Sequence, residues 1–441
     1  MKFRRRAPLS GRDIQLLILI GIVTLAVLGT LIGADIQVSR GLSGGGGFFA
    51  PWQGARAFLF RHAPPYGTSV ATLVQDQVYG RPARAGESPY LPTVPFFLLP
   101  LYFPFAFLGE PATARGLWMF IGECALVGTA FVTLRLIEWQ PGRVFQIAFA
   151  LLSVFGFYAI NSLLEGGPAI LLGLLYVAVL FAYDTGQDEL AGALLALSLF
   201  AWEIGSLFIV LLLWKSLYDK RQRVLAGLGM TLLLLLVVSF LIYPAWLLPY
   251  LSASLAMMRA SFGTTAAQVL ERLSPVYGAR ASQALTVLLV IVLIYEWAAT
   301  RRADARRFIW AACLTLAVTP LVGFRIELGN LVVLFPSLAL IFAAVANRWR
   351  GGYWLASLLL LIVFVLPWGW YLRWTWEQNQ RAYDYLVLFL PLFTVAGLYW
   401  TRWWFVRPPR TWFDHVRTTL SPTQRLANSR RTVSLASGTA R

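Results

Sequence analysis

The sequence has little charge for its length. Lys, Arg, Asp and Glu make up 13% of the 441 residues, whereas apolar and aromatic residues make up 58%. A soluble domain of ordinary composition carries about a quarter charged residues. The shortage of charge therefore argues against a soluble enzyme or binding domain and favours a chain that lies in lipid.

Histidine and cysteine are nearly missing as well. His62 and His415 are the only histidines, which argues against a histidine-based metal site and against a Ser-His-Asp triad. Cys124 and Cys313 both fall within apolar segments, where we predict small buried side chains and no disulfide. No Walker-type phosphate-binding loop occurs, so no nucleotide-driven motor is encoded. We expect neither a metal ion nor a cofactor.

Long apolar runs are what the sequence has in abundance. Runs of about 18 residues or more can cross a bilayer core of about 30 Å, and they recur along the whole chain. We therefore predict an all-α polytopic membrane protein with about twelve transmembrane helices, the first being a retained span that is too long for a signal-peptide core. The predicted spans lie near residues 14–34, 94–108, 116–136, 144–161, 168–183, 190–214, 224–243, 284–299, 308–324, 330–346, 353–372 and 386–400.

The basic residues predict how these spans are oriented. The net charge of +17 is spread over short loops and a tail, which is typical of the positive-inside rule and of attraction to anionic lipid, and we expect no nucleic-acid binding. Five basic segments fall on one face, which we assign to the cytoplasmic side of a multi-pass plasma-membrane protein with both termini inside. These segments are KFRRR at the N-terminus, 215–223, 301–307, 347–350 and the tail from residue 401.

The chain is expected to divide into two parts. Residues 1–400 form the polytopic membrane domain, which is surrounded by the lipid bilayer. Residues 401–441 form a basic tail that begins with TRWWFVRPPR. Its composition predicts an aromatic and basic anchor at the interface, followed by a disordered cytoplasmic end.

The longest loops lie on the opposite face and are rich in Trp, Tyr and Pro, which suits a lipid–water interface. Within the first of them, residues 35–93, a run of four glycines at 44–47 is typical of a flexible joint. The segment that follows has helical spacing, with Trp52, Ala55 and Phe58 on one face. We predict that it and a second segment, TSVATLVQDQVYG, form amphipathic helices that lie along the outer membrane surface.

The same loop carries a set of short motifs. They read W-x-x-A-R-x-F-L from Trp52, P-P-Y ending at Tyr66, Y-G-R-P-A from Tyr79 and P-Y-L-P-x-x-P around Tyr90. In combination they resemble the first outer loop of glycosyltransferase family 87, polytopic alpha-mannosyltransferase-like proteins of the GT-C architecture that are also described as a domain of unknown function. The later segments AGALLALSLF and ELGNLVVLFPSLAL resemble the same family, so the resemblance covers roughly residues 40–350.

This resemblance implies a membrane glycosyltransferase with a GT-C-like fold. Its donor would be a polyprenyl-phosphate sugar, mannose-like, and its acceptor a lipid-linked or surface glycan on the outer face. Such a transfer needs a carboxylate as general base on the acceptor hydroxyl, cationic groups for the departing phosphate and a dry groove that aligns both substrates.

Three positions depart from the family pattern. The family has Gly-Asp-Phe shortly before the tryptophan, and its Asp is the expected base, but the matching residue here is Gly47. Gly167 stands where the family has Gln, and Glu203 ends an Ala-Trp-Glu segment where the family has a Lys-Pro-Gln-like one. The pattern leaves two possibilities: activity is lost or altered, or other carboxylates have taken over.

Replacement carboxylates are few. Glu87 lies in the first outer loop, where a surface ion pair with Arg84 is the alternative interpretation. Glu165, Glu203 and Glu327 lie in or near spans, and a carboxylate in a membrane is costly enough to suggest a function, although pairing with an arginine is the alternative. We take Glu87, Glu203 and Glu327 as the catalytic candidates. Weaker candidates, for which interfacial or snorkelling charges are the alternative, are Asp35, Glu123 and Glu296.

Basic side chains near the same face are candidates for holding the phosphate. They are Arg56 and Arg84 in the first outer loop and Arg325 at the outer end of a span, with interfacial anchoring or a local ion pair as the alternatives. Tyr66 is a candidate for contact with the substrate, and the alternative is an aromatic residue of the interfacial belt.

Two other functional classes stay open. A catalytically inactive relative would bind a polyprenyl lipid without transferring sugar. A transporter would need broken helices and a charged site at the membrane midplane, and the EGGPA segment and the proline-rich spans are compatible with one. An outward cavity that holds a carboxylate within reach of an arginine would favour the transferase.

Overall fold

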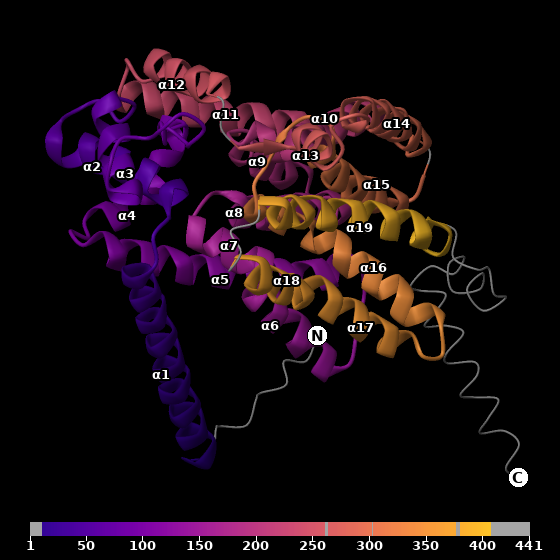
Figure 1. The fold of residues 1–441 in the computed structure, drawn as a ribbon. Helices are drawn as coiled ribbons and strands as arrows, with labels where there is room; N and C mark the ends of the chain where they lie inside the picture. Colours follow the sequence, from indigo (N-terminus) through magenta and orange to yellow (C-terminus); the bar gives the residue numbers. More distant parts are fainter. Residues whose placement is uncertain (1–10, 261–262, 302, 376–379, 407–441) are drawn as a thin grey trace, which may run out of the picture.

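A computed structural model describes residues 11–260, 263–301, 303–375 and 380–406, and these residues are almost entirely helical (Figure 1). The helices of the first half are α1 (Gly11–Gly41), α2 (Gly46–Arg61), α3 (Thr68–Tyr79), η1 (Phe96–Tyr102), α4 (Phe103–Ala106), α5 (Pro111–Leu136), α6 (Arg143–Phe155), α7 (Phe157–Glu165), α8 (Ala169–Asp184), α9 (Asp188–Leu197) and α10 (Trp202–Tyr218). The second half holds α11 (Gln222–Ile242), α12 (Leu247–Arg259), β1 (Thr264–Thr265), α13 (Ala266–Leu273), α14 (Gly278–Ala299), α15 (Ala305–Val318), η2 (Thr319–Leu321), β2 (Arg325–Ile326), η3 (Leu328–Leu334), α16 (Phe335–Arg348), α17 (Gly352–Phe364), α18 (Leu366–Thr375) and α19 (Gln380–Val406). Strands β1 and β2 form an antiparallel ladder in which Thr264 pairs with Ile326 and Thr265 with Arg325.

The predicted membrane class is confirmed by the lengths and compositions of the helices. Among the described residues, seven helical segments are long and apolar enough to cross a bilayer. An eighth candidate is the pair α6 and α7, which bends by 43°. The chain is therefore an all-α polytopic membrane protein, and eight of the predicted spans fall on these segments. The seven long segments are Gly21–Gly41, Pro111–Leu136, Gln222–Ile242, Gly278–Ala299, Leu328–Arg348, Gly352–Arg373 and Tyr383–Trp403.

The four other predicted spans fall on shorter helices. The span predicted near 94–108 coincides with η1 and α4, the span near 168–183 with α8, and the span near 308–324 with α15 and η2. The span predicted at 190–214 is interrupted, because non-helical residues 198–201 separate α9 from α10. The count of twelve spans stays a prediction, and seven or eight long ones are present in the described part of the chain.

The larger of two apolar cores fills the centre of the helix bundle. Trp310, Leu338 and Phe342 are among its fully buried side chains. Cys313 is buried in this core as predicted, but Cys124 is exposed because it faces outward from α5. Both cysteines are free.

Helices α2, α3 and α12 lie together at one end of the molecule, which we call the loop end (Figure 1). The helices predicted in the first outer loop form as α2 and α3. However, α2 buries Trp52 and Ala55 in a second, mostly aromatic core, and Trp52 Nε1 donates to the Phe105 carbonyl at 2.8 Å. The face that was predicted to lie on the membrane is thus packed inside the protein, because η1 and α4 contact it.

The basic loop at 215–223 is tied into the bundle. Lys215 is buried, and its Nζ contacts Asp219 Oδ1 at 2.9 Å and donates to the Thr300 carbonyl at 3.0 Å. Lys215, one of the basic residues predicted to face the cytoplasm, therefore connects α10 to the end of α14. The N-terminal KFRRR segment and residues 407–441 of the predicted tail lie outside the described residues.

Helices α9 and α11 cross at glycines. A Cβ at Gly192 would collide with the Val224 carbonyl and would meet Leu228 N at 2.6 Å. Gly227 on α11 is pressed in the same way against the backbone of Glu189. Small residues allow two backbones to touch, which is a common way for helices to associate in lipid.

Replacing Gly192 by leucine is expected to push α9 and α11 apart, because the added side chain has no room at the crossing. We expect a loss of about 1–3 kcal/mol or more, measured as a lower Tm of the detergent-solubilised protein. Gly229→Leu on α11 is the control, since a Cβ there meets nothing within 4 Å. Equal Tm values for the two variants would contradict the tight crossing.

Candidate functional site

The four glycines at 44–47 form a fixed corner between α1 and α2. Gly44 and Gly45 have φ angles of +106° and +84°, a region that side chains disfavour and glycine adopts freely. A Cβ at Gly45 would meet Arg115 Nε at 2.6 Å. The flexible joint predicted from composition is therefore a tightly packed corner, which we call the glycine corner.

The second half of the glycine corner is packed against two distant segments. A Cβ at Gly46 would overlap the ring of Tyr90. A Cβ at Gly47 would meet Gly167 Cα and N at 2.8 Å and the Glu165 carbonyl at 3.0 Å. These contacts are to backbone atoms that cannot rotate away, so no side chain fits at Gly47 unless the backbone moves.

Glu165 is the carboxylate that meets the glycine corner. It is the last residue of α7, and Gly166 follows in a left-handed conformation with φ +68°. The amide of Gly47 donates to Glu165 Oε1 at 3.1 Å. Backbone N–H groups in the first turn of a helix lack partners within the helix and attract negative charge. Gly45, the N-cap residue of α2, has no side chain that could cap the helix. The Glu165 carboxylate, at the end of α7, caps the first turn of α2 instead.

Glu327 reaches the same region because η3 packs closely on α7. A Cβ at Gly329 would meet Ser162 Cα at 2.9 Å, one turn before Glu165. Glu327 directly precedes η3, and its charge interacts with that of Glu165. Asn330 Nδ2 lies 3.5 Å from Glu327 Oε2, at the limit of a hydrogen bond. The carboxylate therefore keeps most of its capacity to accept hydrogen bonds.

Glu203 is the third acid of this group. It lies half-buried in the first turn of α10, directly after the break that follows α9. Its charge interacts with those of Arg325 and Glu327. We call Glu165, Glu203 and Glu327 the acidic cluster. Two of the three predicted catalytic candidates, Glu203 and Glu327, are thus brought together with an acid that the sequence also marked.

Arg325 holds α12 to the acidic cluster. Its Nη2 donates to the carbonyls of Met258 at 2.7 Å and Ala260 at 3.0 Å, and its Nη1 donates to that of Met257 at 3.1 Å. The guanidinium therefore caps the C-terminal end of α12, where unpaired carbonyls carry partial negative charge. The charge of Arg325, a predicted phosphate-binding residue, interacts with that of Glu203, while its N–H groups bind the backbone carbonyls of α12.

Arg115 is a cation that the sequence did not single out. It is 1% exposed, and it donates to the carbonyl of Leu42 at 2.9 Å and to that of Leu164. Its charge interacts with that of Glu165. Because it precedes a predicted span, it resembled an ordinary flanking charge. In the structure it joins the end of α1 to the end of α7.

Tyr79 and Tyr90 approach the acidic cluster from the first outer loop. Their rings lie 5.5 Å apart, and Tyr90 has a φ of +47°, which is uncommon for a residue with a side chain. Burial, together with the negative charge of Glu165, raises the pKa of Tyr90 far above its usual range. Burial also raises the pKa of Tyr79. Both hydroxyls therefore stay protonated and can donate hydrogen bonds.

Glu327 is the member of the acidic cluster that is most open to solvent. Desolvation by the surrounding elements and the neighbouring Glu203 carboxylate raise the pKa of Glu327, and the charge of Arg325 offsets part of this rise. Water reaches the side chain, and its screening limits both effects. Glu327 consequently takes up a proton more readily than an isolated glutamate.

Glu87, the third catalytic candidate, is engaged in an ion pair of its own. Arg81 donates Nη1 to Oε2 at 2.8 Å and Nη2 to Oε1 at 2.7 Å, and the amide of Arg84 donates to Oε2 at 2.8 Å. These hydrogen bonds hold the pKa of Glu87 at about 2. The predicted alternative of an ion pair is supported, but the partner is Arg81 instead of Arg84. A carboxylate with so low a pKa is a weak general base.

The other predicted substrate-binding residues contact the protein itself. Arg56 Nη1 donates to the carbonyls of Ala106 at 3.0 Å and Leu108 at 3.1 Å. Tyr66 is buried, and its hydroxyl donates to a backbone carbonyl at 3.0 Å. The side chain of Arg84 is exposed. The hydrogen bonds of Arg56 and Tyr66 stabilise the loop end. Among the described residues, no contact is found between the acidic cluster and Arg56, Tyr66 or Arg84.

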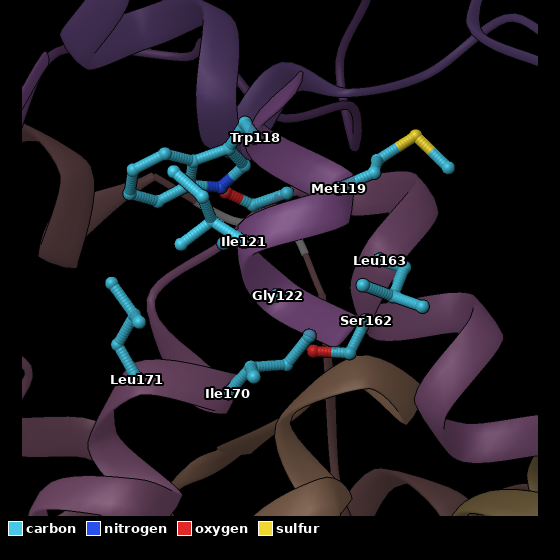
Figure 2. A pocket seen from close by; sticks show the side chains of 10 residues that line it. Trp118, Met119, Ile121, Gly122, Ser162, Leu163, Ile170 and Leu171 are labelled. Carbon is cyan, nitrogen blue, oxygen red and sulfur yellow. The ribbon is translucent and has the colours of Figure 1, made fainter. Parts of the chain in front are cut away.

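A small pocket lies between α5, α7 and the start of α8 (Figure 2). Its volume of about 10 Å³ holds roughly one water molecule. Trp118 Nε1 donates to the Gly166 carbonyl at 3.0 Å beside it. This pocket is too small for a ligand larger than water, whereas the acidic cluster is open to solvent on the side of Glu327. The lining residues are Trp118, Met119, Ile121, Gly122, Ser162, Leu163, Gly166, Gly167, Ile170 and Leu171.

Comparisons of the chain with family models, with curated proteins and with solved structures find no match. Within the described ranges, no group of three or more His, Cys, Asp and Glu side chains is placed to hold a metal ion. The polar side chains of the candidate site are carboxylates, arginines and tyrosines.

Gly47→Ala is expected to destabilise the protein, because the added methyl group would press on the Gly167 backbone and separate α2 from α7. We expect a cost of about 1–3 kcal/mol, measured by thermal unfolding in detergent. Gly41→Ala is the matched control, since a Cβ there meets nothing within 4 Å. If Gly47→Ala proved as stable as Gly41→Ala, the packing of the glycine corner would be wrong.

Glu87→Gln is expected to lower the Tm at neutral pH but not in acid. The folded pKa of about 2 lies below the usual 4.5, so the ion pair contributes fully above about pH 4.5 and its contribution is lost as the pH falls towards 2. The Tm difference between wild type and variant should shrink over this range. Glu138→Gln, which alters an exposed pair with Arg306, is the control. A difference that stays constant with pH would refute the assignment.

Proposed function

We propose that this chain is a membrane glycosyltransferase of the GT-C type. It moves a mannose-like sugar from a polyprenyl-phosphate donor to a hydroxyl group of a lipid-linked or surface glycan. The observation that supports this best is the place of Glu165. Its carboxylate lies 3.1 Å from the amide of Gly47, the residue that matches the catalytic Asp of the family that the sequence resembles.

The positions that depart from the family pattern are connected in space, which also supports the proposal. Gly47 and Gly167, which replace an Asp and a Gln, pack so closely that a Cβ on Gly47 would lie 2.8 Å from the Gly167 backbone. Glu203, in the third departing segment, is coupled to Glu327. A chain that had only lost its catalytic groups would be expected to fill the site with apolar side chains. Here the Glu165 carboxylate contacts the Gly47 amide, and its charge interacts with that of Glu327.

In this proposal Glu165 is the general base. It takes the proton of the acceptor hydroxyl while the hydroxyl oxygen forms a bond to the anomeric carbon of the donor sugar. The bond from that carbon to the phosphate oxygen breaks, and polyprenyl phosphate leaves with the electron pair. The amide of Gly47 orients the carboxylate. Glu203 and Glu327 stabilise the positive charge that develops on the sugar ring.

The location suits substrates whose tails stay in lipid. Glu165 ends α7 and Glu203 lies in the first turn of α10, and Glu165 contacts the start of α2 at the loop end. Arg325 is the cation that we assign to the departing phosphate, because it is coupled to Glu203 and Glu327. The proposal includes about twelve spans, a loop end on the outer face of the plasma membrane and both termini in the cytoplasm.

A transporter is the second candidate, and two broken helices favour it. The bend of 43° between α6 and α7 lies one short helix before Glu165, and the break between α9 and α10 directly precedes Glu203. Interrupted helices that carry acids are typical of substrate sites in transporters. An inactive relative that binds the donor lipid is the third candidate, and the experiment below separates the three.

Glu165→Gln is expected to slow sugar transfer by about 10²–10⁴-fold without weakening donor binding, because the amide cannot take the proton. The measurement is transfer of labelled mannose from polyprenyl-phosphate mannose to a glycolipid acceptor in proteoliposomes. Glu138→Gln, at a site 77% exposed, is the control with unchanged rate.

Each other outcome of this experiment has a definite meaning. Equal transfer by wild type and Glu165→Gln would exclude Glu165 as the base. Donor binding without transfer by the wild type would support the inactive relative. Substrate flux across the liposome membrane without transfer would support the transporter.

A further inference from the structure

Helix α1 is attached to the bundle mainly at one crossing with α5. The candidate span Gly21–Gly41 is only 6% buried, so most of α1 faces outward (Figure 1). At the crossing, a Cβ at Gly116 would meet the Ile36 backbone at 2.8 Å. The two helices therefore touch backbone to backbone next to the end of α1.

Two acids are buried between these helices. Asp35 on α1 and Glu123 on α5 are each 6% exposed, and their charges interact. Asp35 Oδ2 and Glu123 Oε2 are buried without a hydrogen-bond partner among the described residues. The interfacial or snorkelling charges expected from the sequence do not fit this burial.

Among the described residues, no cation is paired with these acids. Arg40, one turn beyond Asp35, donates Nε to Glu110 Oε1 at 3.0 Å. Arg115, two turns before Glu123 on α5, is bound to backbone carbonyls. Cys124, the neighbour of Glu123, is exposed on the outer side of α5. The charged and titratable groups around the two acids are thus turned to other partners or away from them.

Ser39 supplies a third oxygen near the acids. It lies one turn after Asp35 on the same helix, is 8% exposed, and its Oγ has no hydrogen-bond partner among the described residues. Hydroxyl side chains in membrane helices commonly donate to the carbonyl four residues before. Thr30 on α1 and Ser239 on α11 do so at 2.8 and 2.7 Å. Ser39 does not, so its hydroxyl is available to a ligand on the Asp35 face of α1.

Two ionised carboxylates cannot remain side by side in a dry interface without a positive partner. Removing an unpaired charge from water costs several kcal/mol or more, and a neighbouring like charge adds to that cost. A proton is the cation that fits, because one carboxyl group can bind it without further ligands and its binding lowers the repulsion between the two acids.

We propose that Asp35 and Glu123 form an intramembrane proton-binding site, in which the two acids together hold a proton between α1 and α5 and the Ser39 hydroxyl donates to Asp35. The bound proton removes the net repulsion between α1 and α5 and allows the close crossing at Gly116. The site is independent of the proposed transfer reaction. It lies where α1 leads into the glycine corner, so loss of the proton would loosen the segment on which α2 depends.

Infrared spectroscopy of the full chain in hydrated lipid films at pH 7 tests this site. Wild type should show a carbonyl stretch of a protonated carboxyl group that is missing from Asp35→Asn/Glu123→Gln. Each single variant should keep a protonated carboxyl group at a shifted frequency, because its partner has become an amide. Glu138→Gln is the control with an unchanged spectrum. Identical spectra for wild type and double variant would contradict the proposal. If the double variant does not fold, unshifted carboxyl bands in both single variants would contradict it.

A second measurement separates a proton from a metal cation. The two amides imitate the protonated pair, so the double variant should keep its Tm as the pH rises, whereas the wild type should lose stability when the proton leaves. Replacing sodium by choline at constant pH and ionic strength should leave the Tm of the wild type unchanged. A Tm that rises with sodium in the wild type, but not in the variants, would contradict proton binding and indicate a sodium site.

Discussion

The start of α2 rests directly on the end of α7, and the arrangement of the loop end depends on this contact. Gly47 approaches the Gly167 backbone so closely that a Cβ would lie 2.8 Å from it, and the approach brings the Gly47 amide to the Glu165 carboxylate. Arg115 binds the ends of α1 and α7 at the same corner. With α2 held in this way, the aromatic core around Trp52 is fixed above the bundle.

The glycine corner and the acidic cluster both contain features that cost folding free energy. Glycines lose much conformational freedom on folding, and acids at the ends of membrane helices are costly to desolvate. Tyr90, in a left-handed conformation against Gly46, adds local backbone strain at the same place. Costs of this kind concentrated in one region are typical of a functional site, whereas the apolar core around Trp310 shows ordinary burial.

Composition and periodicity predicted the membrane class, most of the long spans and the helices α2 and α3, because these depend on local sequence. Glu203 and Glu327 stood out for the same reason, since each is an acid within apolar surroundings. The rigid packing of 44–47 could not be predicted, because its partner Gly167 is distant in the sequence. The ion-pair partner of Glu87 was predicted as Arg84 and is Arg81, because the loop carries more than one arginine close to Glu87 in the sequence. The break at residues 198–201, which divides the span predicted at 190–214, was not predicted, because the segment is apolar on both sides of it.

The central claim is that Glu165, held by the amide of Gly47, faces the sugar that is transferred. An experimental structure with a non-transferable polyprenyl-phosphonate sugar analogue tests it most directly. The account predicts that the anomeric carbon lies beside the Glu165 carboxylate, that the phosphonate lies on the side of Arg325, and that the Gly47 hydrogen bond is kept. An analogue bound elsewhere, or a first turn of α2 separated from Gly167 with Glu165 turned away, would contradict it.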